Sequence, residues 1–266
     1  MSEPLVSIIM GAYNAKDTIE YCIDSILSQT YSNWEFVICD DCSTDETYSI
    51  LEKYAKQDAR IKILRNDKNS RLAASLNRCL SVASGKYIAR MDADDASLPE
   101  RLKKQVEYLE AHPEIDLVGC ARIIFDENGE QGIRRGIEYP NRESLLTDSP
   151  FAHPTIMMKK SGYDALGGYN VSAQTMRAED LDLWFRFFAA GYTGYNMDEP
   201  LYLYREGVED MGKRTLKAGV GIAKVFWQGY ALLGYPYRKR IWALKPIIAS
   251  LVPRKLMHHH HLRKLG

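Results

Sequence analysis

The 266-residue sequence carries three groups of acidic side chains whose spacing could support chemistry on a charged substrate. The densest contains Asp92, Asp94 and Asp95, directly after an apolar segment. Three carboxylates this close repel one another unless a cation or hydrogen-bond donors neutralise them. Mg and Mn prefer oxygen ligands and bind diphosphates through one or two protein carboxylates. An acidic turn that caps the next helix is the alternative, but the position after a strand-like run favours a Mn or Mg site.

The second group, Asp40 and Asp41, follows another apolar segment. Carboxylates at such a place can accept hydrogen bonds from a uracil N–H or from ribose hydroxyls. Capping of the next helix is the alternative role. We predict that Ser43 and Glu46 form a capping box there, which leaves Asp40 and Asp41 available for a nucleotide.

The third group, Glu179, Asp180 and Asp182, stands at the start of a predicted helix that also carries Trp184. Asp180 could take the proton of a hydroxyl group if it faces a substrate cleft. The alternative is ordinary first-turn acidity, which the helix dipole favours. The motif alone does not separate these two roles.

Alternating strand and helix patterns are expected to position these groups. The apolar strand patterns cover residues 5–10, 35–39, 61–64 and 86–90, and helical patterns cover 17–29, 73–83 and 99–111, with another helix after Ser43. This alternation predicts an α/β fold with a mainly parallel sheet. In such sheets ligands lie beyond the carboxyl ends of the strands, where the polar residues after these patterns would share one cleft. Shorter strands are expected over 115–154, a helix over 178–190 and a short strand over 201–204.

Six segments occur in an order that resembles the family 2 glycosyltransferases of bacterial polysaccharide assembly. They are VSIIMGAYN, ICDDCSTDET, NSRLAASLN, SGKYIARMDADD with LPERL, HPTIM and AEDLDLWFR, within residues 5–205. The resemblance implies the GT-A fold, a mainly parallel central sheet flanked by helices, here with a C-terminal helical tail. It also implies an inverting, metal-dependent enzyme that moves a hexose or N-acetylhexosamine from a nucleotide-diphospho-sugar, usually a UDP-sugar, to an acceptor hydroxyl.

The resemblance also assigns roles to single residues. The nucleotide pocket would include Gly11, Ala12 and Tyr13, with Asp41 and neighbouring Asp40 at the base or ribose. Asp92 would contact the ribose side and share the metal, while Asp94 would ligate the Mn or Mg that bridges the diphosphate. Asp180 would be the catalytic base, with Glu179 beside it. His153 and Trp184 fall in the acceptor half, where His153 has either a structural role or an acceptor contact.

The sequence departs from the family pattern at two positions. Arg71 stands where many members have glycine, and it either reaches the nucleotide or is a surface residue. Gly207 stands where many members have a histidine that is thought to help bind the metal. Water or a neighbour such as Glu206 would replace that ligand, unless metal binding is looser than in relatives.

Three other functions compete with glycosyl transfer. A redox enzyme is suggested by Cys39 and Cys42, but Cys39 lies in an apolar strand pattern, where cysteine is usually a small core residue. No second CxxC motif offers zinc a full set of ligands. A nucleotidyltransferase would also use paired aspartates, but no glycine-rich phosphate loop with a basic signature is found near the N-terminus. A nucleotide-sugar-binding protein without activity is opposed by the presence of Asp94 and Asp180.

Charge is distributed unevenly along the chain. The sequence has 35 basic and 35 acidic residues, yet none of the acidic ones follows Asp210. Aromatic and aliphatic residues interleave with Lys and Arg in this tail, which favours an amphipathic helix on an anionic membrane surface near a lipid-linked glycan acceptor. Packing on the catalytic domain is the alternative. Nucleic-acid binding is disfavoured because the rest of the chain is net acidic.

We therefore predict a catalytic domain over residues 1–208, divided into a nucleotide-binding half (1–97) and an acceptor half (98–208). A basic amphipathic helical tail is expected over 209–266. Five cysteines without a disulfide pattern and no secretory signal favour a cytoplasmic protein, peripheral on the inner face of the cell membrane. The run His258 to His261 is left out of the site, because the sequence does not show whether it is native.

Overall fold

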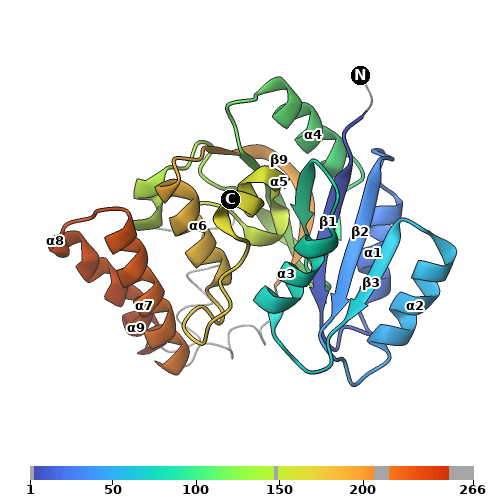
Figure 1. Ribbon diagram of the computed structural model, residues 1–266, viewed down its shortest axis with the longest axis horizontal. Coiled ribbons are helices and arrows are strands. Elements are labelled where there is room, and N and C mark those ends of the chain that lie inside the picture. The colour runs from blue at the N-terminus through green and yellow to red at the C-terminus, as the bar shows by residue number, and fades with distance from the viewer. Residues whose placement is uncertain (1–2, 147–148, 207–215, 252–266) are drawn as a thin grey trace.

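The computed structural model describes residues 3–146, 149–206 and 216–251. Its centre is a nine-stranded sheet with the order β3-β2-β1-β4-β8-β6-β9-β5, in which β7 pairs with β6 (Figure 1). The first ninety residues contribute β1 (Val6–Ala12), β2 (Trp34–Asp40), β3 (Ile61–Arg65) and β4 (Tyr87–Arg90). These four strands are parallel to one another, as the alternating strand and helix patterns predict.

The segment after β4 completes the sheet with mixed pairing. It contributes β5 (Ala96–Ser97), β6 (Leu117–Asp126), β7 (Gly129–Arg134), β8 (Met157–Lys159) and β9 (Gly194–Arg205). Strand β8 pairs antiparallel with both β4 and β6, whereas β6 and β9 are parallel. The strand predicted over residues 201–204 is therefore only the end of a twelve-residue strand. The sequence around Pro200 did not indicate a continuous strand. The pairing of β6 with β9 is irregular at this point, where Pro200 lies opposite Ala121.

Helices cover both faces of the sheet. One core contains residues of α1 (Ile19–Leu27), α2 (Thr47–Gln57) and α4 (Arg101–Ala111). The other core contains residues of α3 (Leu72–Val82), α5 (Lys160–Leu166) and α6 (Glu179–Ala189). The 3-10 turns η1 (Arg142–Leu146) and η2 (His153–Thr155) precede β8. Because both faces are covered, all seven residues of β2 are buried, which explains its continuous apolar pattern.

The C-terminal helices are α7 (Leu216–Leu232), α8 (Tyr237–Arg240), the 3-10 turn η4 (Ile241–Leu244) and α9 (Lys245–Leu251), at one end of the molecule in Figure 1. Among the C-terminal helices α7 packs on α6, and the shorter ones pack on α7. Tyr230 is buried against Phe185 of α6, and its hydroxyl donates to the Leu145 carbonyl at 3.1 Å. The described part of the tail is thus helical as predicted, and one side of it belongs to the core of the catalytic domain. Of the helices in the described ranges, none is both long and apolar enough to span a bilayer.

Two helix starts differ from the sequence prediction. Helix α2 begins at Thr47, and the Ser43 hydroxyl accepts the N–H of Asn14 at 3.0 Å instead of capping the helix. Asp45 accepts the N–H and the hydroxyl of Thr47. At α1, the N-cap residue Thr18 makes no side-chain capping bond. The capping box predicted from Ser43 and Glu46 was wrong, because the Ser43 hydroxyl bonds to the loop after β1.

Candidate active site

Asp92, Asp94 and Asp95 follow the carboxyl end of β4, and one oxygen from each lies within 4.8 Å of the others. Asp94 is exposed, Asp92 is half-buried and Asp95 is buried. One Asp95 oxygen accepts the Arg205 N–H at 2.8 Å, and the other is buried without a hydrogen-bond partner within residues 3–146, 149–206 and 216–251. Burial, and then the charges of Asp92 and Asp94, raise the pKa of Asp95 well above its usual value. This concentration of carboxylate charge fits a divalent cation.

Strand β9 fixes the acidic loop from the side. The backbone N–H of Asp92 donates to the Tyr202 hydroxyl at 3.2 Å, and Arg205 Nε donates to the Asp94 carbonyl at 3.1 Å. The sequence indicated Asp92 and Asp94 as ligands but did not select Asp95. The contacts from β9 are long-range, so no local pattern could have revealed that Asp95 turns inward.

Arg90, the last residue of β4, forms an ion pair with Asp92. Its side chain is only 2% exposed, and its Nε and Nη1 atoms have no partner among the described residues. The sequence reasoning did not include Arg90 in the site. The available signal was a single arginine within an otherwise apolar strand, two residues before the first aspartate.

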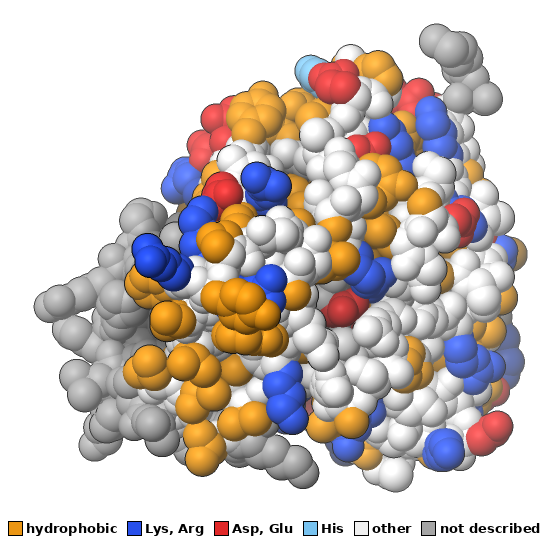
Figure 2. All heavy atoms as spheres, turned by 60° about the vertical axis from the view of Figure 1, so that its left-hand side comes forward, with side chains coloured by type: hydrophobic (Ala, Val, Ile, Leu, Met, Phe, Trp, Pro, Cys, Tyr) orange, Lys and Arg blue, Asp and Glu red, His pale blue; other side chains and the backbone are white. Residues whose placement is uncertain are grey.

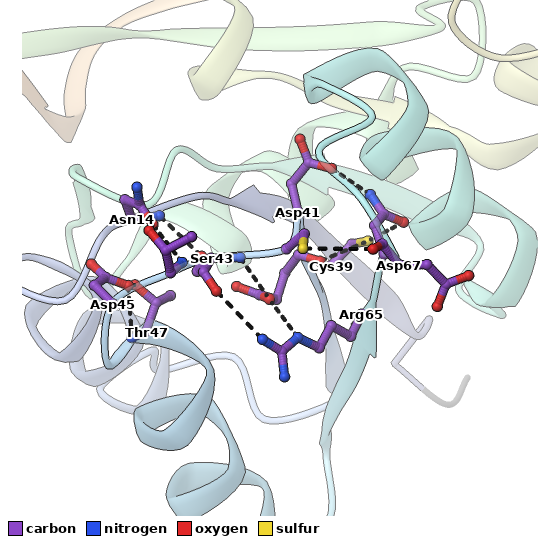
Figure 3. Close-up of polar contacts among 12 residues, drawn as sticks. Asn14, Cys39, Asp41, Ser43, Asp45, Thr47, Arg65 and Asp67 are labelled. Carbon is purple, nitrogen blue, oxygen red and sulfur yellow. Dashed lines mark hydrogen bonds and ion pairs between the residues drawn. The ribbon is translucent and has the colours of Figure 1, made fainter.

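The predicted nucleotide carboxylates position loops at the ends of β2 and β3 (Figure 3). Asp41 accepts Asn66 Nδ2 at 2.6 Å and the N–H groups of Ser70 and Arg71 at 2.7 Å each. Asp40 accepts the Ser43 N–H at 3.2 Å and pairs with Arg65 Nε at 3.2 Å. The premise that capping leaves both carboxylates unused was wrong, because each already accepts hydrogen bonds from neighbouring loops.

Asn14 and Asp45 connect the loop after β1 to the loop after β2, as Figure 3 shows. The Asn14 side-chain oxygen accepts the Thr44 N–H at 2.9 Å, and Asp45 accepts the Lys16 N–H at 3.2 Å. The two loops at this edge of the sheet therefore form one hydrogen-bonded unit.

The predicted pocket residues Gly11 and Ala12 belong to β1 itself rather than to the loop after it. A Cβ at Gly11 would lie 3.0 Å from Leu72 Cδ1 and 3.2 Å from Ser75 Cβ, so glycine permits close packing of α3. Ala12 is buried, whereas the Tyr13 side chain is 49% exposed. Of these three residues, Tyr13 has an accessible ring face on which a base could stack.

Glu179 and Asp180 open helix α6 and are both half-buried. Burial raises the pKa of each carboxyl, and the charge of Asp180 raises the pKa of Glu179 further. The pKa of Asp180 is also raised by Asp92 and lowered by Arg90, so the α6 start and the β4 end interact electrostatically. The two acidic motifs, separated by more than eighty residues, are therefore brought to one region.

The two predicted acceptor residues lie below the surface. Trp184 is fully buried, packed edge-on against Phe151 with ring centroids 5.1 Å apart. His153 is 8% exposed, and its Nε2 is 2.8 Å from the Tyr169 hydroxyl. Burial, and then the charge of Arg90, lower the pKa of His153 well below its usual value. The buried position of Trp184 contradicts direct acceptor contact, and the structure favours the structural role for His153.

The two departures from the family pattern have different surroundings. Arg71 is exposed, at the N-cap of α3, with φ 72° and ψ 168°, a backbone conformation that favours glycine. Glu206, considered as a substitute metal ligand, pairs with Arg134 at 2.8 Å. Gly207 lies outside the described residues.

The cysteines do not form a redox pair. Cys39 is fully buried in β2, as expected for a small core residue, and all five cysteines are free. The thiol of Cys42 donates to the Asp67 carbonyl at 3.7 Å, while that of Cys39 is 3.5 Å from Asn66 Oδ1.

A mixed sheet whose first four strands are parallel and end in an acidic cluster, with two further carboxylates opening a nearby helix, defines the GT-A class of glycosyltransferase. Comparison with known proteins agrees, since residues 7–167 match the model of glycosyl transferase family 2. The chain is 44% identical over 265 residues to the putative glycosyltransferase EpsE of Bacillus subtilis (strain 168), covering 99% of this chain and 95% of that protein. This chain belongs to glycosyl transferase family 2.

A second relative is the UDP-Glc:alpha-D-GlcNAc-diphosphoundecaprenol beta-1,3-glucosyltransferase WfaP of Escherichia coli. It is 32% identical over 192 residues, which cover 72% of this chain and 73% of that protein. Among solved structures, S. aureus TarS 1-349 in complex with UDP-GlcNAc shares the fold at a TM-score of 0.64 and 19% identity, covering 98% of this chain and 88% of that one. Mannosyltransferase PcManGT from Pyrobaculum calidifontis, in complex with GDP-Man and Mn2+, does so at 0.65 and 20%, covering 98% and 80%.

Proposed function

We propose that this chain is an inverting, metal-dependent glycosyltransferase that moves a hexose or N-acetylhexosamine from a UDP-sugar to a hydroxyl of a lipid-linked glycan. The observation that carries the proposal is the electrostatic proximity of Asp180 to the carboxylates after β4. This arrangement provides a proton acceptor beside a place for a diphosphate. The nucleotides in the titles of the TarS and PcManGT structures support a nucleotide-sugar donor.

The residues divide the reaction between them. Asp92, Asp94 and Asp95 would hold Mn or Mg, which would neutralise charge on the diphosphate. Asp180 accepts the proton of the acceptor hydroxyl as that oxygen forms a bond to the anomeric carbon. The bond from the anomeric carbon to the diphosphate oxygen breaks on the opposite face, and UDP leaves with its electron pair. One displacement therefore inverts the anomeric configuration.

The raised pKa of Asp180 suits this role, because a more basic carboxylate is a better proton acceptor. Glu179 stands next to it, and burial and then the charge of Asp180 raise the pKa of Glu179 as well. We assign Tyr13 and Arg71, which are both exposed, to the nucleotide, because an aromatic face and a cation fit a base and a phosphate.

A lipid-linked acceptor is supported by the surface of the C-terminal helices. We define the C-terminal patch as the exposed hydrophobic side chains Trp227, Tyr237, Ile241, Trp242, Leu244 and Ile248. Arg238, Lys239, Arg240 and Lys245 lie on the same helices. Figure 2 shows these hydrophobic groups bordered by basic ones, beside a hollow in the surface that contains acidic side chains.

Aromatic and aliphatic groups among cations suit the headgroup region of an anionic bilayer. The relative WfaP is named for a diphosphoundecaprenol acceptor, which supports the same class of acceptor here. We therefore assign the protein to the inner face of the cell membrane, bound peripherally through the C-terminal patch.

The test is UDP release from a panel of UDP-sugars, each with Mn, with Mg and with EDTA. Slow hydrolysis of the true donor is expected without acceptor, provided that a metal is present. Release from one donor that EDTA abolishes would support the enzyme and identify the sugar. Metal-dependent UDP binding without any turnover, even with lipid-linked acceptors, would instead support an inactive nucleotide-sugar-binding protein. Absence of both UDP binding and UDP release would contradict the proposed UDP-sugar donor.

A further inference from the structure

Arg90 occupies an unusual position beneath the proposed site. Along β4, Ile88 belongs to the core under α3 and α6, whereas Ala89 belongs to the opposite core. Because side chains alternate along a strand, Arg90 points to the same side as Ile88. That side carries Asp180, His153 and Tyr169, whose pKa values all respond to the charge of Arg90.

The guanidinium of Arg90 is committed to a single side chain. Its Nη2 contacts Asp92, while Nε and Nη1 are buried without hydrogen-bond partners in the described part of the chain. A buried arginine with unused donors is unfavourable for folding, because those N–H groups lose water and gain nothing. By contrast, Arg101 is also fully buried but donates to Ser97 and to three backbone carbonyls. A contribution to folding stability therefore accounts for the burial of Arg101 but does not account for the burial of Arg90.

We infer that Arg90 is a positioning residue, which acts from below the cleft by fixing the Asp92 carboxylate and by supplying a permanent positive charge between the donor end and the base. The inference rests on the proposed function and adds a residue to it. A carboxylate held on one oxygen by a buried guanidinium presents its other oxygen in a fixed direction. Residues that orient ligands in this way typically change metal affinity 10–100-fold when they are replaced.

The positive charge of Arg90 also acts on Asp180, the proposed base. The pKa of Asp180 is raised by burial, and Arg90 is the side-chain charge that lowers it. His153 cannot replace this charge, because its depressed pKa keeps the imidazole neutral. Arg90 therefore favours the ionised form of Asp180, and through its ion pair it holds the Asp92 carboxylate in place.

The experiment measures UDP binding with Mn and with EDTA, together with Tm, for wild type, R90Q, R90K, D92N and the double variant R90Q/D92N. We expect R90Q to weaken Mn-dependent UDP binding by about tenfold or more, and R90K to recover part of the loss. If Arg90 acts through Asp92, the double variant binds no more weakly than D92N alone. Two single losses that multiply in the double variant would overturn the inference, as would wild-type affinity in R90Q.

Arg101→Lys is the matched control, since it changes a fully buried arginine that bonds to backbone carbonyls. It is expected to lower Tm and to leave Mn-dependent UDP affinity unchanged. Equal affinity losses in R101K and R90K would mean that any buried arginine in this region affects binding through the fold, and would overturn the inference. Absence of Mn-dependent UDP binding in the wild type would contradict the proposed donor site itself, so the two failures are distinguishable.

Discussion

The carboxylate of Asp41 accepts the backbone N–H of Arg71 at 2.7 Å, and Arg71 adopts φ 72° and ψ 168°. That conformation is nearly exclusive to glycine and costs a residue with a side chain about 1–3 kcal/mol. Asp41 accepts the Ser70 N–H as well, so one carboxylate holds the strained turn at the start of α3. The strain lies at the proposed nucleotide end of the site.

Replacing Arg71 with glycine is therefore expected to stabilise the protein. Relief of strain exceeds the extra chain entropy of glycine, and the net gain should be about 1 kcal/mol. Thermal unfolding measures the gain, and donor KM measures any loss of a nucleotide contact. R71A is the control, because it removes the guanidinium and keeps the strain. Equal Tm values for R71G and R71A would contradict the strained backbone, while an equal rise of donor KM in both would identify a side-chain contact.

Asp94→Asn is expected to abolish the dependence of UDP affinity on Mn. An amide keeps the shape but removes the charge that a divalent cation needs, and Asp94 is the exposed member of the acidic cluster. Calorimetric titration of UDP with Mn and with EDTA provides the measurement. Asp198→Asn is the matched control, since that carboxylate is 77% exposed and outside the cluster. A D94N variant in which Mn still strengthens UDP binding would remove Asp94 from the metal site.

Asp180→Asn is expected to retain UDP binding and to lose about 10²–10⁴-fold in turnover, the usual contribution of a general base. In the wild type, the raised pKa of Asp180 places the acidic limb of the rate profile above the ordinary aspartate range, because activity falls as this carboxylate is protonated. Steady-state rates across pH test the limb. Asp182→Asn is the control on the same helix, since Asp182 pairs with Arg186 at 2.8 Å. Turnover in D180N near the wild-type rate would exclude Asp180 as the base.

The raised pKa of Asp180 also affects the stability of the folded protein. Because the folded state raises the pKa of Asp180, the folded protein binds this proton more tightly than the unfolded chain does. The contribution of Asp180 to stability is therefore most favourable when the pH is below the pKa of Asp180 in the unfolded chain. It declines as the pH rises through the pKa of Asp180 in the folded protein. We expect D180N to remove that loss, so its Tm at neutral pH should equal or exceed the wild-type Tm. A clearly lower Tm at neutral pH would contradict the unfavourable burial of this charge.

The sequence predicted those features that depend on residues close together along the chain. The apolar run before Arg90 and the acidic residues after it predicted both β4 and the acidic cluster at its end, because a strand and a loop of this length are encoded by adjacent residues. The parallel sheet followed from the alternating strand and helix patterns in the same way. Their order along the chain also supported the family, which the comparisons established.

Features that depend on distant contacts were missed. Asp41 was interpreted as available to a nucleotide, but its oxygens accept N–H groups from residues 25 to 30 positions away. Asp95 is buried by a bond from Arg205, which is 110 residues distant. Trp184 shares its helix with Asp180 but points into the core, and the sequence could not fix the rotation of that helix accurately enough to show this. Arg90 was overlooked because a lone arginine in a strand pattern carries no local signature.

The C-terminal patch should bind anionic vesicles. Replacing Ile241 and Ile248, both 64% exposed, with glutamate is expected to weaken this binding by at least about tenfold, since each buried isoleucine contributes about 1.5–3 kcal/mol. Vesicle co-sedimentation measures the binding, and donor hydrolysis shows whether the site is intact. Val82→Glu on α3 is the control, with a side chain that is 42% exposed away from the patch. Vesicle binding that survives the double substitution would exclude the patch as the membrane contact.

Helix α7 should be part of the folding unit, because Gly229 allows it to approach Phe185 of α6. A Cβ at Gly229 would lie 2.2 Å from the Phe185 ring, so G229A must displace the ring or the helix at a cost of about 1–3 kcal/mol. Gly221 on the same helix is the matched control, since its nearest contact would be 3.8 Å away. There alanine should stabilise by about 0.5–1 kcal/mol through helix propensity. Thermal unfolding would then show Tm shifts of opposite sign. A rise in Tm for both variants would mean that α7 is not packed against α6, and the C-terminal helices would then be an independent element rather than part of the catalytic core.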